Sequence, residues 1–152
     1  MEIIFRKLPD NRHDLEVRDR RGPDVRLMSQ ATGPSMPHDF VHAAVESALA
    51  ITDGFWGAMA RGATFEGFEP TTPTRHRRSG LKVLRRGGEA VLRAELCVNW
   101  AYRVWSGLST EGKGVGRSPL DGRQVALACA ALDRTAERWA GLGEGRTLTW
   151  RW

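Results

Sequence analysis

Residues 2–28 read EIIFRKLPDNRHDLEVRDRRGPDVRLM, and this stretch decides the class of fold. Residues 2–8 are typical of a strand, residues 13–20 alternate between apolar and polar side chains, and residues 25–28 favour a third strand. Pro9-Asp10-Asn11 and Gly22-Pro23-Asp24 are turn sequences that separate them. The stretch predicts an antiparallel β meander whose apolar face needs a cover of helices.

The sequence that follows the meander predicts helices first and a loop next. We expect a helix over residues 37–50, with Ser35 as its N-cap and Pro37 in its first turn. Residues 55–60, FWGAMA, predict a short second helix. Residues 64–80 contain prolines and several threonines and predict a basic loop.

The last third of the chain predicts two long helices and a closing strand. We expect the helices over residues 89–105 and from the capping sequence 118–121 to residue 140. Residues 146–152 alternate cleanly and predict a strand that joins the N-terminal sheet, since chain termini often lie close together. The prediction is therefore one α+β domain over residues 1–152, with an antiparallel meander and a C-terminal strand packed against three to four helices. Its parts are residues 1–30, 37–62, 64–80, 89–140 and 146–152.

The composition is that of a globular protein, with 41% apolar and 27% charged residues. The net charge of +5 has one local cluster, residues 75–86, which contains Arg75-His76-Arg77-Arg78, Lys82, Arg85 and Arg86. Such a cluster can contact phosphates, but it is more often a solvated loop. Because no zinc-finger, helix-turn-helix or RNA-binding aromatic signature accompanies it, we expect no nucleic acid partner. The six tryptophans are expected to lie in a core or a cleft.

Several features bear on the compartment. The start MEIIFRKLPD lacks the apolar region of a signal peptide, and no apolar run approaches the ~20 residues of a membrane span. Cys97 and Cys129 lie in apolar helical patterns and are expected to be buried free thiols. These features predict a soluble cytoplasmic protein without a membrane partner, and they leave the oligomeric state open.

The helix over residues 37–50 carries a pair of histidines, His38 and His42, one turn apart. Side chains at this spacing point the same way and can share one ion. Both fall at the edge of the predicted buried stripe, where the wall of a cleft is expected. His38-Asp39-Phe40-Val41-His42 resembles the HExxH motif of zinc metallopeptidases, whose glutamate activates the metal-bound water. Here Asp39 takes the glutamate's place, so it would act through a second water or orient a histidine.

A catalytic zinc has three protein ligands, so another residue must complete the predicted site. We expect Glu95 as the third metal ligand, because it stands on an otherwise apolar face of the helix over residues 89–105. An ion pair between Glu95 and an arginine of another element is the alternative. Glu46 lies about 12 Å along the helix from His38 and is expected to support His42 by a hydrogen bond. Further candidates for the third ligand are Asp53, Glu66, Glu69, His13 and His76.

Gly54-Phe55-Trp56-Gly57 follows the histidine helix and is expected either to fill the core or to line a pocket. In the pocket interpretation, Phe55 and Trp56 form one wall, and the candidates for the other wall are Trp100, Tyr102 and Trp105. A β meander, a PHDxxHxxVE helix and a GFWG segment in this order are similar to a family of small bacterial proteins without an assigned activity. The resemblance covers residues 37–46 and 54–62, and it implies a compact bacterial cytosolic domain but no catalytic residue.

Three functions remain open at this point. The first is a metal-dependent enzyme, most simply a hydrolase of a small molecule or peptide, with zinc or another divalent metal on His38 and His42 and with Asp39 or Glu46 handling a proton. The second is a binding or regulatory module. The third is a metal-free enzyme in which Glu46 orients His42 as the general base. No nucleotide cofactor is expected, since residues 112–116 lack the spacing of a dinucleotide fingerprint and no Walker loop is present.

Overall fold

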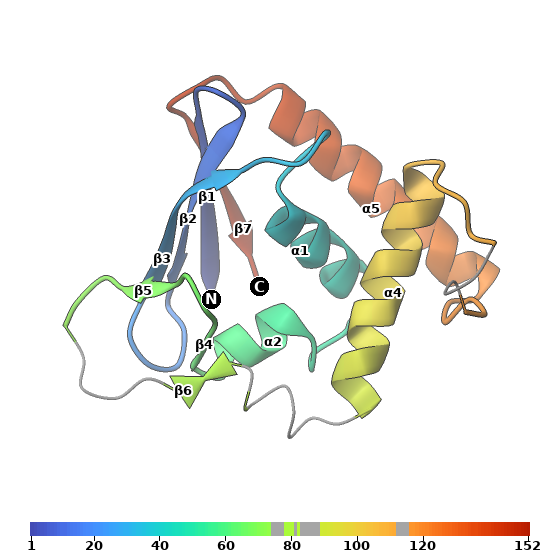
Figure 1. Cartoon of the computed structure of the whole chain (residues 1–152), viewed down its shortest axis with the longest axis horizontal. Helices are drawn as coiled ribbons and strands as arrows, with labels where there is room; N and C mark the ends of the chain where they lie inside the picture. Colours follow the sequence, from blue (N-terminus) through green and yellow to red (C-terminus); the bar gives the residue numbers. More distant parts are fainter. Residues whose placement is uncertain (74–77, 81, 83–88, 112–115) are drawn as a thin grey trace.

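The computed structural model describes residues 1–73, 78–80, 82, 89–111 and 116–152. Its main element is an antiparallel sheet of five strands in the order β5-β3-β2-β1-β7, and helices cover one face of this sheet (Figure 1). The strands are β1 (Glu2–Leu8), β2 (Arg12–Arg18), β3 (Val25–Ala31), β5 (Glu69–Pro70) and β7 (Thr147–Arg151). This confirms the predicted α+β class, the meander and the return of the C-terminal strand to the N-terminal sheet.

Alternation along the strands produces the buried face of the sheet. Ile3 and Phe5 of β1 pair with Val17 and Leu15 of β2, and all four side chains are buried. On the other side of β1, Phe5 pairs with Leu148 of β7. Because neighbours along a strand point to opposite faces, these apolar residues all face the helices.

Helix α1 (His38–Ala48) lies between the sheet and the two long helices α4 (Glu89–Trp105) and α5 (Gly122–Ala140), as Figure 1 shows. The short helix α2 (Phe55–Ala60) follows α1. Phe40 of α1 stacks on Phe5 with 4.4 Å between the ring centroids and meets Trp150 edge-on. Residues 40–46 of α1 are all buried, so any polar group among them needs a partner inside the protein.

The predicted start and end of the first helix were wrong by one or two residues. Pro37 occupies the N-cap position instead of Ser35, and no side chain caps this helix. Pro37 has an extended ψ of 139°, so the chain turns into the helix directly after it. At the other end Ala50 adopts a positive φ of 52°, and the Ile51 amide bonds to the Glu46 carbonyl, which closes the helix at Ala48.

The loop predicted over residues 64–80 contains short strands. Glu69–Pro70 adds β5 to the edge of β3, and the following Thr71 amide donates to the Asp24 carbonyl at 2.9 Å. Strand β4 (Ala63–Thr64) pairs in parallel with β6 (Arg78–Ser79). Two-residue strands are too short to show alternation, so the sequence pattern could not reveal them. Most of the basic cluster (74–77, 81 and 83–88) and residues 112–115 of the glycine-rich segment lie outside the described residues.

The predicted cap at the start of the last helix is confirmed. The Asp121 carboxylate accepts a hydrogen bond from the Gln124 amide at 2.8 Å, and the Gln124 side chain accepts one from the Asp121 amide at 3.0 Å. This reciprocal pair is a capping box, which satisfies two amides at the start of α5.

Replacing Asp121 with alanine is therefore expected to lower the free energy of unfolding by about 1 kcal/mol. Urea denaturation of Asp121→Ala against the wild-type chain measures the loss. Asp121→Ser is the matched control, since serine is also a good N-cap and should recover most of the stability. Equal losses in both variants would show that the cap does not stabilise α5.

Candidate functional site

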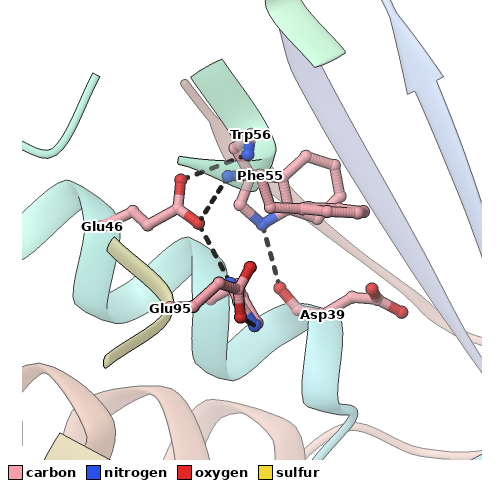
Figure 2. Close-up of polar contacts among 6 residues, drawn as sticks. Asp39, Glu46, Phe55, Trp56 and Glu95 are labelled. Carbon is pink, nitrogen blue, oxygen red and sulfur yellow. Dashed lines mark hydrogen bonds and ion pairs between the residues drawn. The ribbon is translucent and has the colours of Figure 1, made fainter. Parts of the chain in front are cut away.

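A buried carboxylate, that of Glu46, forms the centre of the site on α1. The residue is 1% exposed, and its two oxygens accept three hydrogen bonds (Figure 2). The donors are Nδ1 of His42 at 3.0 Å, the Phe55 amide at 3.0 Å and the Trp56 amide at 3.1 Å. Full pairing is what allows a carboxylate to be buried in a protein core.

The glycines of the Gly54-Phe55-Trp56-Gly57 segment explain how α2 reaches this carboxylate. A Cβ atom at Gly54 would lie 2.6 Å from the Glu46 carboxyl carbon, and one at Gly57 would lie 1.9 Å from the Thr52 carbonyl oxygen. Both distances are too short for any residue other than glycine without a local shift. The segment therefore brings the first two amides of α2 directly onto Glu46.

His42, which is 6% exposed, links the buried carboxylate of Glu46 to the half-exposed side chain of Glu95. Because a carboxylate can only accept a hydrogen bond, Nδ1 of His42 carries the proton that is donated to Glu46. Nε2 of His42 is then left as the second functional atom. This Nε2 lies 3.8 Å from Oε2 of Glu95, whose side chain is 48% exposed. Burial lowers the pKa of His42, but the hydrogen bond to Glu46 and the nearby charges of Glu95, Glu46 and Asp39 outweigh it and raise the pKa above its usual value of 6.5.

His38 is exposed and lies next to the buried His42. The two ring centroids are 4.9 Å apart, with the ring planes at 81° to one another. Desolvation by the surrounding protein, followed by the neighbouring charge of His42, lowers the pKa of His38 below its usual value. The pKa values of the two histidines are thus shifted in opposite directions, that of His38 downwards and that of His42 upwards.

Asp39, predicted as the counterpart of the metallopeptidase glutamate, has a different neighbour. Its Oδ2 is 4.0 Å from Nε2 of His13, and its backbone carbonyl accepts the Trp56 indole N–H at 3.0 Å. Burial raises the pKa of the Asp39 carboxyl above its usual value. In Figure 2 the Asp39 carboxylate points away from Glu46, so the two carboxylates occupy separate places.

His13 stands on β2 and is 2% exposed. Its Nδ1 pairs with the Thr32 hydroxyl at 3.1 Å, and its Nε2 is buried without a hydrogen bond. Burial lowers the pKa of His13. His13 therefore lies behind Asp39, in the interior.

The other predicted site residues are spread over the molecule. Glu66 and Glu69 are exposed and form no hydrogen bond or ion pair with His42 among the described residues. Asp53 borders a different cavity, and His76 lies outside the described residues. Trp56 is fully buried, which agrees with the core interpretation of this tryptophan, while the Phe55 ring lies 5.7 Å from the His42 ring. Trp100 lines a separate cavity with Leu96 and Arg103, and the Tyr102 ring contacts Trp105.

The sequence indicated the hydrogen bond between His42 and Glu46, and the structure contains it. The two backbone amides that complete the Glu46 site were missed. Their only signal in the sequence is a glutamate on a buried helical turn, followed by two glycines that frame a Phe-Trp pair. In the part of the chain that is described, no three His, Cys, Asp or Glu residues are grouped so that they could hold a metal ion.

Comparisons of the chain with protein-family models, with curated proteins and with solved structures found no match. Among the described residues, no helix has the length and apolar character needed to cross a bilayer. The function must therefore be argued from the geometry of the site itself.

Proposed function

We propose that this protein is an enzyme in which His42 serves as a general acid–base group for a small-molecule or peptide substrate. The observation that carries the proposal is the position of His42 between two carboxylates. Its Nδ1 bonds to the buried Glu46 at 3.0 Å, and its Nε2 faces the exposed Glu95 at 3.8 Å.

Glu46 supplies what an acid–base histidine needs from a partner. It fixes the tautomer with the proton on Nδ1, so Nε2 of the neutral ring is the atom that accepts a proton from a substrate. The amides of Phe55 and Trp56 hold the carboxylate, and the ring of His42 cannot rotate without losing this hydrogen bond. A purely structural Glu46 would need the amides alone, and His42, one turn towards the N-terminus, adds a side chain that contacts the half-exposed Glu95.

The charge balance of His42 also suits this role. General acid–base catalysis is most effective when the pKa of the group lies near the working pH. The hydrogen bond to Glu46 and the neighbouring carboxylates raise the pKa of His42 above its usual value, so the ring takes up a proton more readily than a free imidazole does. Glu95 stabilises the protonated ring that forms after proton transfer, and His38 offers a neutral donor or acceptor beside it.

A divalent metal site is the second candidate, and one distance favours it. Two ligands of a tetrahedral zinc are separated by about 3.4 Å, given bond lengths near 2.1 Å. The 3.8 Å between Nε2 of His42 and Oε2 of Glu95 is close to that separation. A carboxylate behind a histidine, as Glu46 stands behind His42, is also the usual support of a metal ligand. His38 would have to move closer to serve as the third ligand, since the described residues do not group three such side chains around one point.

Carbethoxylation by diethyl pyrocarbonate, mapped by mass spectrometry, tests the acid–base proposal. The reagent attacks neutral imidazole, so at alkaline pH both His42, at Nε2, and His38 are expected to react. His13 is the internal control, because its Nε2 is fully buried. A His42 that resists the reagent as His13 does, in the folded chain, would refute the proposal, since no substrate could then reach Nε2.

Zinc distinguishes the two candidates. The metal proposal predicts stoichiometric zinc in protein purified without a histidine tag, loss of this zinc in a His38→Ala, His42→Ala double variant, and protection of His42 from the reagent by added zinc. Unchanged reactivity in the presence of zinc, with no bound metal, leaves the acid–base role and excludes the metal.

A further inference from the structure

A cavity of about 380 Å³ lies between the C-terminal end of α1 and the helices α4 and α5. Residues 49–53 after α1 form one part of its wall, the face of α4 with Arg93 and Cys97 forms another, and Leu120 and Gln124 border it at the start of α5. The volume lies within the range of small-molecule sites, which is about 300–1,000 Å³. Its lining does not include His42, Glu46 or Glu95.

One part of the cavity wall is electronegative. Asp53 is half-buried and has no hydrogen bond or ion pair with any residue that the structure describes. Leu49, Ala50 and Ile51 stand where α1 ends, and the carbonyl end of a helix carries partial negative charge. An ammonium group in the cavity would be stabilised by both.

Another part of the wall is electropositive. Arg93 of α4 is exposed and enters the lining, where its guanidinium donates a hydrogen bond to the Cys97 sulfur, and no described carboxylate forms an ion pair with it. Gln124 lies in the first turn of α5, whose amide end is capped by the Asp121 carboxylate, and Leu120 precedes this cap, so the positive charge of this wall comes from Arg93. Guanidinium groups bind carboxylates with two parallel hydrogen bonds, so a carboxylate fits here.

We propose that this cavity binds a free α-amino acid with an aliphatic side chain. Its ammonium group pairs with Asp53 at the end of α1, its carboxylate pairs with Arg93, and its side chain packs against Leu49, Ile51 and Leu120. A ligand with only one charge leaves either Asp53 or Arg93 without an oppositely charged partner among the described residues. This site is independent of the role of His42.

L-leucine is the probe for this site. In nitrogen–proton correlation spectra of the full chain, it is expected to shift the amide signals of residues 49–53 and 90–97 in a saturable way. 4-Methylpentanoate lacks the ammonium group, and 3-methylbutylamine lacks the carboxylate, so each is expected to bind about tenfold more weakly or worse. No saturable shift with leucine, or equal binding of the three compounds, would overturn the proposal.

Three variants assign the contacts. Asp53→Asn and Arg93→Gln are expected to weaken leucine binding about tenfold each. Arg123→Gln is the matched control, since Arg123 is an exposed arginine of α5 that does not line the cavity, and its binding should equal that of the wild type. If Arg123→Gln lost as much leucine binding as Arg93→Gln, the loss would reflect the change in net charge and not a contact in the cavity. That result would contradict the proposed site.

Discussion

Glu46→Gln is expected to lower the free energy of unfolding by roughly 3 kcal/mol. Three donors converge on the Glu46 carboxylate, and an amide offers them only one accepting oxygen. The amide nitrogen then faces a donor, so at least one buried N–H is left without an acceptor. Urea denaturation followed by tryptophan fluorescence measures the loss.

Glu95→Gln is the matched control for Glu46→Gln, since it removes the other carboxylate of His42 from a side chain that is 48% exposed. Exposed pairs contribute little, so its effect on stability should stay below about 1 kcal/mol. Similar losses in the two variants would show that the buried carboxylate does not tie α2 to α1.

The pH dependence of these variants follows from the direction of the His42 shift. A pKa raised on folding stabilises the folded chain fully below the unfolded value of 6.5, and this stabilisation is lost as the pH rises through the folded pKa. The loss in Glu46→Gln should therefore be larger at about pH 6 than at about pH 9. His13 acts in the opposite direction, because its pKa is lowered on folding and the folded chain is destabilised as the pH falls below 6.5.

Local patterns predicted most of the fold. Alternation marked β2 and β7, the strand-like sequence of residues 2–8 marked β1, and the helix predicted over residues 89–105 has the bounds of α4. The cap at Asp121 and the hydrogen bond from His42 to Glu46 also depend on residues three or four positions apart, a spacing that can be evaluated within one helix. In each of these cases the contact lies within one element or follows from a simple period.

The features that escaped prediction join parts of the chain that are far apart. His13 lies beside Asp39 because β2 packs against the start of α1, and Glu46 receives two amides because α2 folds back on α1. The cavity beside Asp53 needs three helices to form its walls. Tertiary packing brings such groups together, and no periodic pattern in the sequence predicts the direction in which one helix packs against another.

Gly57→Ala is expected to destabilise the protein, although alanine is the better helix former by about 1 kcal/mol. The new Cβ would lie 1.9 Å from the Thr52 carbonyl oxygen, a backbone atom that cannot rotate away. Helix α2 must then move relative to the loop before it, which pulls the Phe55 and Trp56 amides away from Glu46. We expect a loss of about 3 kcal/mol in the free energy of unfolding and, by NMR titration, a changed pKa of His42.

Gly122→Ala separates this steric effect from helix propensity. Gly122 is also helical, at the start of α5, and a Cβ there would meet nothing within 4 Å. Its replacement should leave the stability unchanged or raise it by up to about 1 kcal/mol, with the pKa of His42 unaltered. If Gly57→Ala behaved in the same way, α2 could not be docked against Thr52 as the structure has it, and the amides of Phe55 and Trp56 could not both reach Glu46. The orientation of His42, and with it the acid–base site, would then have no structural support.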